Sequence, residues 1–385
     1  MPGFELIGTE EFEEIQDIFN NGGILFRYGF DKLRNNCYKV KNFEDEFSRK
    51  FNSRYALAVT SGTAALRVAL ASIGIQPNDE VITQCFTFVA TVEAIIESKA
   101  VPVCAEIDKT LNMDPDDLLN KITNKTKAVI VVHMLGSPAK INKIKEICNE
   151  MGIILIEDTA WGCGGKFNNK YLGTIGDIGT FSFDFAKTMT TGEGGMILTN
   201  NKDFYKKAAA WHDHGHENNP SVPRWEDTRT SSGFNFRMTE LQGAVGLAQL
   251  KKLDFIVQKH RENRDKLVNL FSKFSKIEFR EVPNGSFDTA DALIFFVDSP
   301  STAKRCRELL LQAGLTTKIL PEAYTWHFAG TWMHMPELRI KHPNLEYEFP
   351  KSREILLRSV SIPINVNMSD EIIEKYYLAL KDLLE

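Results

Sequence analysis

The chain has 385 residues, of which 43% are hydrophobic and 25% charged, a composition typical of a globular protein. Its formal net charge is −5 and its lysines and arginines are scattered, which argues against nucleic acid as a partner. No apolar run approaches the roughly 18 residues that a membrane-spanning helix needs, so we expect no membrane segment. The length exceeds that of one ordinary core and predicts two domains.

The cysteines form no Cys-x-x-Cys pair and no metal-ligand spacing. Most of them lie in apolar segments, which is typical of reduced thiols in the core of a cytoplasmic protein. The first residues lack the character of a signal peptide. We therefore expect a cytoplasmic protein.

The first part of the chain predicts two helices joined by an unusual segment. Apolar residues recur at helical spacing over residues 8–20, and a second helix is expected over 41–51. Between them, residues 24–40 are rich in aromatic residues and arginine without periodicity. This composition predicts an ordered arm rather than a regular element.

From residue 55 onward, short apolar strands alternate with helices. Helices are expected over 63–73, 88–98 and 139–151, and strands over 56–59, 80–83, 101–105, 128–132, 153–156, 180–183 and 196–199. This alternation predicts an α/β fold with a mostly parallel seven-stranded sheet flanked by helices. Ligands of such sheets bind at the carboxyl ends of the strands.

A long helical region from Thr239 to about Leu270 follows the predicted sheet. We place the domain boundary inside it, giving an N-terminal arm and large domain over 1–250 and a small domain over 251–385. The small domain is also expected to be α/β, with strands at 277–279 and 292–296 and helices at 302–313 and 371–384.

Lys187 is the central candidate for chemistry. It is the one lysine in a run of small and apolar residues that begins at a strand end near Phe183 and continues into a glycine-rich turn. A desolvated lysine amine is nucleophilic and forms Schiff bases with carbonyls, of which pyridoxal phosphate is the commonest. A surface lysine at a strand–loop junction is the alternative, so the interpretation needs other parts of such a site.

Two further segments could supply those parts. Ser61-Gly62-Thr63-Ala64 stands between a strand and a helix, where backbone N–H groups could hold a phosphate, although a plain N-cap fits the same residues. Glu157-Asp158 ends an apolar strand, and a carboxylate there could keep the cofactor's pyridine nitrogen protonated. A helix cap or a metal ligand is the alternative for this acidic pair.

Other residues at strand ends are less specific. Phe88 follows a strand and could lie on a cofactor ring, or it could be a core residue. His133 ends the strand over 128–132 and is either a satisfied core histidine or a substrate contact. Asn235 and Arg237 precede the long helix among apolar residues, which suits an interface as well as an ordinary loop.

The sequence gives little support to two competing interpretations, a metal site and a nicotinamide cofactor. His212, His214 and His216 would share one face of a strand, but no further ligand is nearby and the preceding segment is predicted to be helical, so we predict no metal site. A nicotinamide enzyme needs a G-x-G-x-x-G turn between a strand and a helix. The turn at 192–195 precedes a strand, and the one at 162–165 lacks the spacing.

The motifs together resemble the DegT/DnrJ/StrS sugar aminotransferases, which are pyridoxal phosphate enzymes of fold type I. The resemblance covers nearly the whole chain and is carried, in the family's order, by Ser61-Gly-Thr-Ala-Ala-Leu66, Glu157-Asp158-x-Ala160, Ser182-Phe-x-x-x-Lys187-x-x-Thr-Thr-Gly-Glu-Gly-Gly195, His214-Gly215 and Gly233-x-Asn-x-Arg-Met238.

The resemblance implies a role for each matched residue. Lys187 would form the Schiff base, Asp158 would pair with the pyridinium, and Phe88 would stack on the ring. The phosphate would be held by Thr63, Ala64 and Ser182 and by Asn235 from a second subunit of a homodimer. Trp161 lies beside the cofactor where the family usually has Gln or His, and Gln84 stands where Pro is usual.

Met1–Leu6, the segment 26–35 and 213–216 resemble the family members that aminate the terminal aldehyde of an oxidised octulosonate. This implies transfer of an amino group from glutamate to an acid sugar in bacterial surface polysaccharide synthesis, with a nucleotide-linked keto-sugar as the alternative acceptor. Arg27 and Arg34 could bind a substrate carboxylate, because arginine fits carboxylates bidentately. His133, His214 and Arg237 are further candidate substrate contacts.

Two rivals share this fold, a sugar dehydratase and a non-catalytic regulator. By resemblance, the dehydratases have His at the lysine position, whereas this chain has Lys187. A regulator would not need both Lys187 and Asp158. The aminotransferase is therefore the preferred interpretation.

Overall fold

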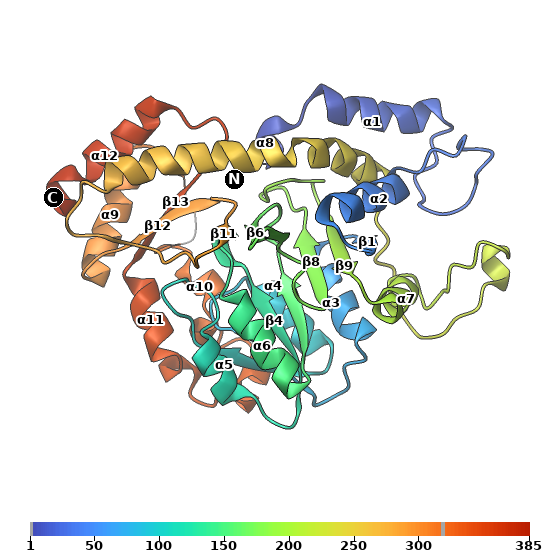
Figure 1. Cartoon of the computed structure of the whole chain (residues 1–385), viewed down its shortest axis with the longest axis horizontal. Helices are drawn as coiled ribbons and strands as arrows, with labels where there is room; N and C mark the ends of the chain where they lie inside the picture. The colour runs from blue at the N-terminus through green and yellow to red at the C-terminus, as the bar shows by residue number, and fades with distance from the viewer. Residues whose placement is uncertain (1–2, 317–319) are drawn as a thin grey trace.

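The computed structural model describes residues 3–316 and 320–385. Its centre is a seven-stranded sheet (Figure 1) with the strand order β1 (Tyr55–Val59), β9 (Gly195–Thr199), β8 (Ile178–Ser182), β5 (Ile154–Asp158), β4 (Thr126–Val132), β2 (Glu80–Gln84) and β3 (Val101–Ala105). Strand β9 runs antiparallel to β1 and β8, while the other neighbours pair in parallel. The predicted mostly parallel sheet and fold type I are confirmed.

The strands are apolar on both faces because helices cover both faces of the sheet. On one face, α3 (Gly62–Ser72) and α7 (Lys202–Trp211) share a core with Leu57, Ile130 and Ile156. On the other face, α5 (Pro115–Lys121) and α6 (Ile141–Met151) pack on Val129 and Leu155. Helix α4 (Val89–Glu97) follows β2 and contacts α3.

Helix α8 (Glu240–Phe271) is the long helix that the sequence predicts, and Figure 1 shows it crossing from the large sheet to the C-terminal region. Thr239 caps the helix in a capping box, in which its N–H donates to the Gln242 side chain at 2.9 Å. The predicted boundary at residue 250 falls inside this continuous helix. The two-domain division stays a prediction.

The C-terminal region has a core of its own. Strands β10 (Glu278–Phe279), β12 (Ala292–Phe296) and β13 (Ser359–Pro363) form an antiparallel sheet, and α9 (Pro300–Gln312) and α12 (Asp370–Leu384) pack on it. The sequence predicts all of these except β13. Smaller elements, unpredicted, are β6 (Lys166–Phe167), β7 (Lys170–Tyr171), β11 (Ser286–Phe287), α10 (Tyr324–His327) and α11 (Pro350–Leu357).

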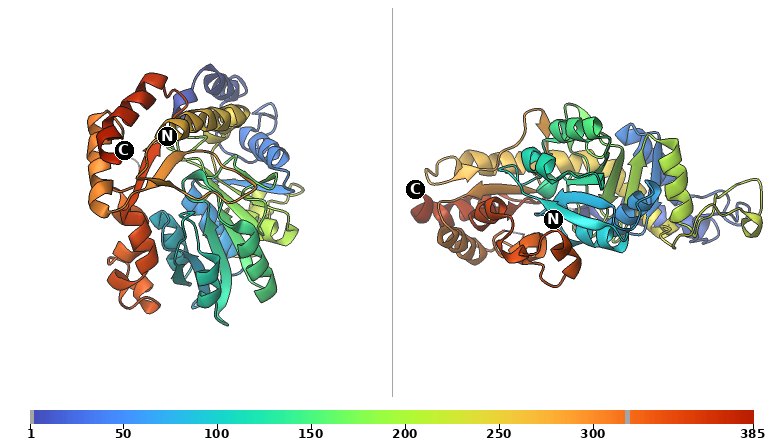
Figure 2. Two further views of the ribbon diagram at one scale, coloured as in Figure 1. Left: turned by 60° about the vertical axis from the view of Figure 1, so that its left-hand side comes forward. Right: turned by 90° about the horizontal axis from the view of Figure 1, so that it is seen from below.

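At the N-terminus, a 3-10 turn over Gly3–Leu6 leads into α1 (Thr9–Asn20), which packs along α8. The predicted arm runs as turns up to α2 (Lys39–Phe51). Figures 1 and 2 show this arm and the loop at residues 213–232 extending from the same end of the molecule. Among the described residues, no helix has the length and apolarity that crossing a membrane requires.

Candidate active site

A cavity of about 690 Å³ lies at the carboxyl edge of the large sheet. It brings together the ends of β5 and β8, the N-terminus of α3 and the loop that carries Lys187. The predicted site residues that line it are Thr63, Phe88, Asp158, Trp161, Ser182 and Lys187. Predicted residues from four separate stretches of sequence therefore meet where a parallel sheet binds its ligands.

Lys187 is half-buried in a tight turn. Its backbone N–H donates to the Asp184 carbonyl at 3.0 Å, and the Thr191 N–H donates to the Phe183 carbonyl at 3.0 Å. The Nζ atom lies 3.6 Å from the centre of the Trp161 ring, close enough for a cation–π contact. The amine is thus directed into the cavity with an aromatic face beneath it.

Asp158 presents its carboxylate at the floor of the cavity. The side chain is buried, and its two oxygens accept hydrogen bonds from the Thr91 hydroxyl at 3.0 Å and the Ala160 N–H at 3.1 Å. Burial raises the pKa of Asp158 despite these bonds and the charge of Lys187. A protonated ring nitrogen would supply the opposite charge that this buried carboxylate needs.

His133 lies behind the cavity wall and outside the lining. It is fully buried, with Nε2 3.0 Å from a Glu157 oxygen and Nδ1 accepting from the Ala139 N–H at 3.1 Å. Burial opposes ionisation of Glu157, but hydrogen bonds from His133 and from the Gly173 and Gly176 amides outweigh it and lower its pKa. Both ring nitrogens of His133 therefore have partners within the chain, as in a core histidine.

The N-terminus of α3 forms a cradle opposite Ser182. A Cβ on Gly62 would lie 2.7 Å from the Ser182 Cβ, so only glycine allows this approach. Ser61 caps the helix by accepting from the Ala64 N–H at 3.0 Å. Ser61, Gly62, Thr63 and Ser182 line the cavity, whereas buried Ala64 does not. Hydroxyls and a helix N-terminus at one wall suit a phosphate group.

The opposite wall comes from residues 322–327, to which the sequence analysis assigned no role. Thr87 donates its N–H to the His327 carbonyl at 2.8 Å, and the Phe88 ring lies 5.7 Å from the His327 ring. Trp326 lines the mouth of the cavity with 70% of its surface exposed, and Glu322 also lines it. The concentration of Trp and His in 321–336 was the only sequence signal for these residues.

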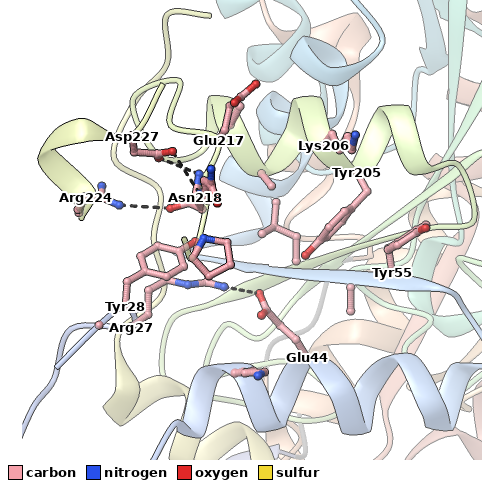
Figure 3. Close-up of a pocket in the computed structure, with 18 of the residues that line it drawn as sticks. Arg27, Tyr28, Glu44, Tyr55, Tyr205, Lys206, Glu217, Asn218, Arg224 and Asp227 are labelled. Atoms are coloured by element: carbon pink, nitrogen blue, oxygen red, sulfur yellow. Dashed lines mark hydrogen bonds and ion pairs between the residues drawn. The ribbon is translucent and has the colours of Figure 1, made fainter. Parts of the chain in front are cut away.

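The structure does not bring Arg27 or Arg34 to this cavity. Arg27 donates to Glu44 at 2.7 Å and to the Ala58 carbonyl at 2.9 Å, and Figure 3 shows it pointing at Glu44. Arg34 is 1% exposed and pairs with Glu240 at 2.8 Å. Both guanidinium groups, expected to meet a substrate carboxylate, are occupied by acidic side chains of their own chain.

The remaining predicted contacts also lie outside the lining. Arg237 and Arg224 both pair with buried Asp213 at 2.5 Å, and together they outweigh the effect of burial and lower its pKa. Asn235 and His214 have exposed side chains on the loop at 213–232 and its continuation. A second cavity of about 1400 Å³ lies between this loop, α2 and α7 (Figure 3).

The three histidines at 212–216 have different surroundings. His212 donates from Nδ1 to the Ala209 carbonyl at 2.6 Å and lies 3.4 Å from the Tyr28 hydroxyl, and burial lowers its pKa to about 3. His216 lies 3.1 Å from Asp227. In residues 3–316 and 320–385, no three His, Cys, Asp or Glu side chains converge as metal ligands.

Comparison with known proteins extends this picture. The chain is 41% identical over 229 residues to the GDP-perosamine synthase of Escherichia coli O157:H7, covering 59% of this chain and 61% of that protein. It is 31% identical over 348 residues to the GDP-perosamine synthase of Vibrio cholerae, covering 89% and 90%. The crystal structure of 3-amino-5-hydroxybenzoic acid synthase superposes with a TM-score of 0.86 at 24% identity, covering 99% and 97%.

The sequence model of the DegT/DnrJ/EryC1/StrS aminotransferase family matches residues 28–381, which include every residue lining the cavity. The predicted enzyme class and the predicted cofactor are thereby confirmed. The chain belongs to the DegT/DnrJ/EryC1/StrS aminotransferase family, with pyridoxal phosphate as its cofactor.

Proposed function

We propose that this chain transfers an amino group from glutamate to the carbonyl carbon of a keto- or aldehydo-sugar in the synthesis of a bacterial surface polysaccharide. One observation carries the proposal: the Lys187 amine and the Asp158 carboxylate face the same cavity, beside the cradle of Gly62 and Ser182. A transaminase needs these three functions at one ligand.

The residues divide the chemistry between them. When bound, pyridoxal phosphate supplies an electron sink for breaking a bond at the amino-bearing carbon. Asp158 would hold the ring nitrogen in its protonated form, and the cradle would orient the phosphate. The Lys187 amine would bind the cofactor, and as general acid–base it would remove the proton from the glutamate Cα and later return it. The Trp161 face keeps this amine beside the cavity.

For the sugar acceptor, we favour a nucleotide-linked keto-sugar. The E. coli and V. cholerae relatives are GDP-perosamine synthases, a name that refers to a nucleotide-linked amino sugar. Among the described residues that line the cavity, Lys187 is the one cation, alongside acidic Asp184, Glu193 and Glu322. Arg27 is paired with Glu44 of the same chain. The cavity wall that this chain forms therefore has few groups that could bind a sugar carboxylate.

An oxidised octulosonate is the second candidate. It rests on the sequence of the segments 26–35 and 213–216, which belong to the two extended arms. A homodimer with shared active sites would give Asn235 a role, since this residue is exposed and does not line the cavity of its own chain. We propose that a second copy supplies Asn235 to the phosphate. The cytoplasmic location stays a prediction.

The test is a screen of purified protein with glutamate and each class of sugar, following 2-oxoglutarate and the mass of the aminated product. We expect nucleotide-linked keto-sugars to react, and Lys187→Ala to abolish both the reaction and the visible absorbance of the bound cofactor. Lys202→Ala, on an exposed lysine, is the control. A chain that binds no cofactor, or that releases water from the sugar without forming an amine, would contradict the proposal.

A further inference from the structure

The first residues of the described chain reach the catalytic loop. Residues 3–11, here called the N-terminal strap, begin with Gly3, whose N–H donates to the Lys187 carbonyl at 2.9 Å. Gly3 is buried although its neighbour Phe4 is 50% exposed. Its burial therefore comes from contact with the Lys187 loop rather than from a general fold of the terminus into the core.

The contact leaves no room for a side chain at position 3. A Cβ there would lie 2.7 Å from the Lys187 carbonyl oxygen and 3.0 Å from backbone atoms of Met189 and Thr190. Backbone atoms cannot rotate away as a flexible side chain would. At Gly8, in the same strap, a Cβ would meet only the Glu10 carboxylate, at 3.7 Å. The two glycines thus differ in a way that can be tested.

A second tie reaches the same loop through buried polar groups. Glu11, 2% exposed, accepts from the Gln249 side chain at 2.8 Å. The oxygen of the fully buried Gln249 side chain accepts from the Thr190 N–H at 3.3 Å. Lys252 also donates to Glu11 at 2.8 Å, and this ion pair neutralises the charge of the buried Glu11 carboxylate. The strap is therefore joined to the loop at both Lys187 and Thr190.

The strap is anchored outside the large sheet as well. The Val366 N–H, between β13 and α12, donates to Glu5 at 2.9 Å, and Lys252 of α8 donates to the Leu6 carbonyl at 2.7 Å. A segment that is bound to α8 and to the C-terminal region thus holds the backbone of the cofactor lysine. Such a brace adds to the hydrogen bonds within the Lys187 turn and further restrains the backbone of that turn.

We propose that the N-terminal strap is a positioning element for the reaction, in which Gly3 and the Glu11–Gln249 pair set the backbone of residues 187–190 and so direct the Lys187 amine toward the cofactor. The inference rests on the proposed function through Lys187. It assigns no contact with substrate to Gly3, which acts only through the Lys187 carbonyl. A displacement of that carbonyl by a few tenths of an ångström moves the root of the reactive side chain.

The experiment compares Gly3→Ala with the matched control Gly8→Ala in the full chain. Cofactor-free protein is titrated with pyridoxal phosphate, and the visible absorbance gives the dissociation constant and the pH midpoint of the bound form. We expect Gly3→Ala to weaken cofactor binding by about tenfold, equal to about 1.4 kcal/mol, and to shift the pH midpoint. Gly8→Ala should stay within about twofold of wild type, because its Cβ meets no backbone.

Gln249→Met tests the second tie with nearly unchanged volume and serves if Gly3→Ala fails to fold. We expect it to move the same pH midpoint, which a loss of stability alone would leave in place. The inference would be overturned if Gly3→Ala and Gly8→Ala had the same cofactor dissociation constant and the same pH midpoint. It would also be overturned if Gln249→Met left the pH midpoint unshifted. A wild-type chain without the visible band would instead overturn the proposed function itself.

Discussion

The buried pair of Arg27 and Glu44 allows a sharp test of what the arm does. The two side chains are 6% and 11% exposed. Glu44 also accepts from the Ala58 N–H at 2.6 Å, while Arg27 donates to the Ala58 carbonyl. Arg27→Met would leave the Glu44 carboxylate buried without its cation. Breaking a buried pair in this way costs about 3–5 kcal/mol, and the abandoned carbonyl adds about 1 kcal/mol.

We therefore expect Arg27→Met to lower the free energy of unfolding by about 4–6 kcal/mol in urea titrations, with the KM for the sugar little changed in the folded protein. Burial already raises the pKa of Glu44. Without Arg27 this pKa rises further, so the neutral acid is favoured in the folded state. The deficit is then fully present at high pH and shrinks as the pH falls through the folded pKa.

Two controls isolate the pair. Arg49→Met breaks an exposed pair with Glu46, whose side chains are 67% and 52% exposed, and should cost less than about 0.5 kcal/mol. Adding Glu44→Met to Arg27→Met should restore much of the stability, because no buried charge remains. A variant that unfolds like the wild type but binds the sugar poorly would refute this reasoning and support Arg27 as a carboxylate ligand.

Three further predictions follow from single contacts. Gly62→Ala drives α3 away from Ser182 and should cost about 1–3 kcal/mol of stability and weaken cofactor binding, measured by thermal melts and absorbance titration. Burial lowers the pKa of His342 from 6.5 to about 4, so stability is lost as the pH falls below 6.5. Wild type should lose about 2 kcal/mol from this group by pH 5, and His342→Gln should lose correspondingly less. Trp326→Ala should raise the KM for the sugar by about threefold to tenfold without raising that for glutamate, whereas the exposed control Tyr347→Ala should change neither.

The large sheet could be predicted because each of its strands is a short apolar run bounded by turn residues. Strand β13 could not, since Ser359-Val-Ser-Ile-Pro363 alternates small polar and apolar residues and ends in proline. Its pairing partner β12 lies more than sixty residues away in sequence. The two-residue strands β6, β7 and β11 are too short to carry any periodicity.

The residues of the candidate site could be predicted where they lie at or just after the end of a predicted strand. Asp158 and Ser182 end β5 and β8, and Lys187 follows five residues after Ser182. The wall formed by Trp326 and His327 was not, because backbone hydrogen bonds to the segment at 85–87 bring it there from the far end of the chain. The burial of Arg27 could not be predicted either. The sequence of an arginine-rich arm does not reveal whether its guanidinium groups are exposed to solvent or paired with acidic side chains of the same chain.

The acidic pair Glu157-Asp158 shows how the sheet assigns different tasks to adjacent residues. Successive side chains of a strand point to opposite faces, so Asp158 shares a face with Ile156 and Glu157 shares one with Leu155. Ile156 packs in the core under α3, whose N-terminus lines the cavity, while Leu155 packs under α6. Asp158 therefore meets the cavity, and Glu157 meets His133 on the other face. The opposite shifts of their pKa values, raised for Asp158 and lowered for Glu157, follow from that alternation. The alternation of side chains along the strand thus explains why Asp158, and not Glu157, lines the same cavity as the N-terminus of α3.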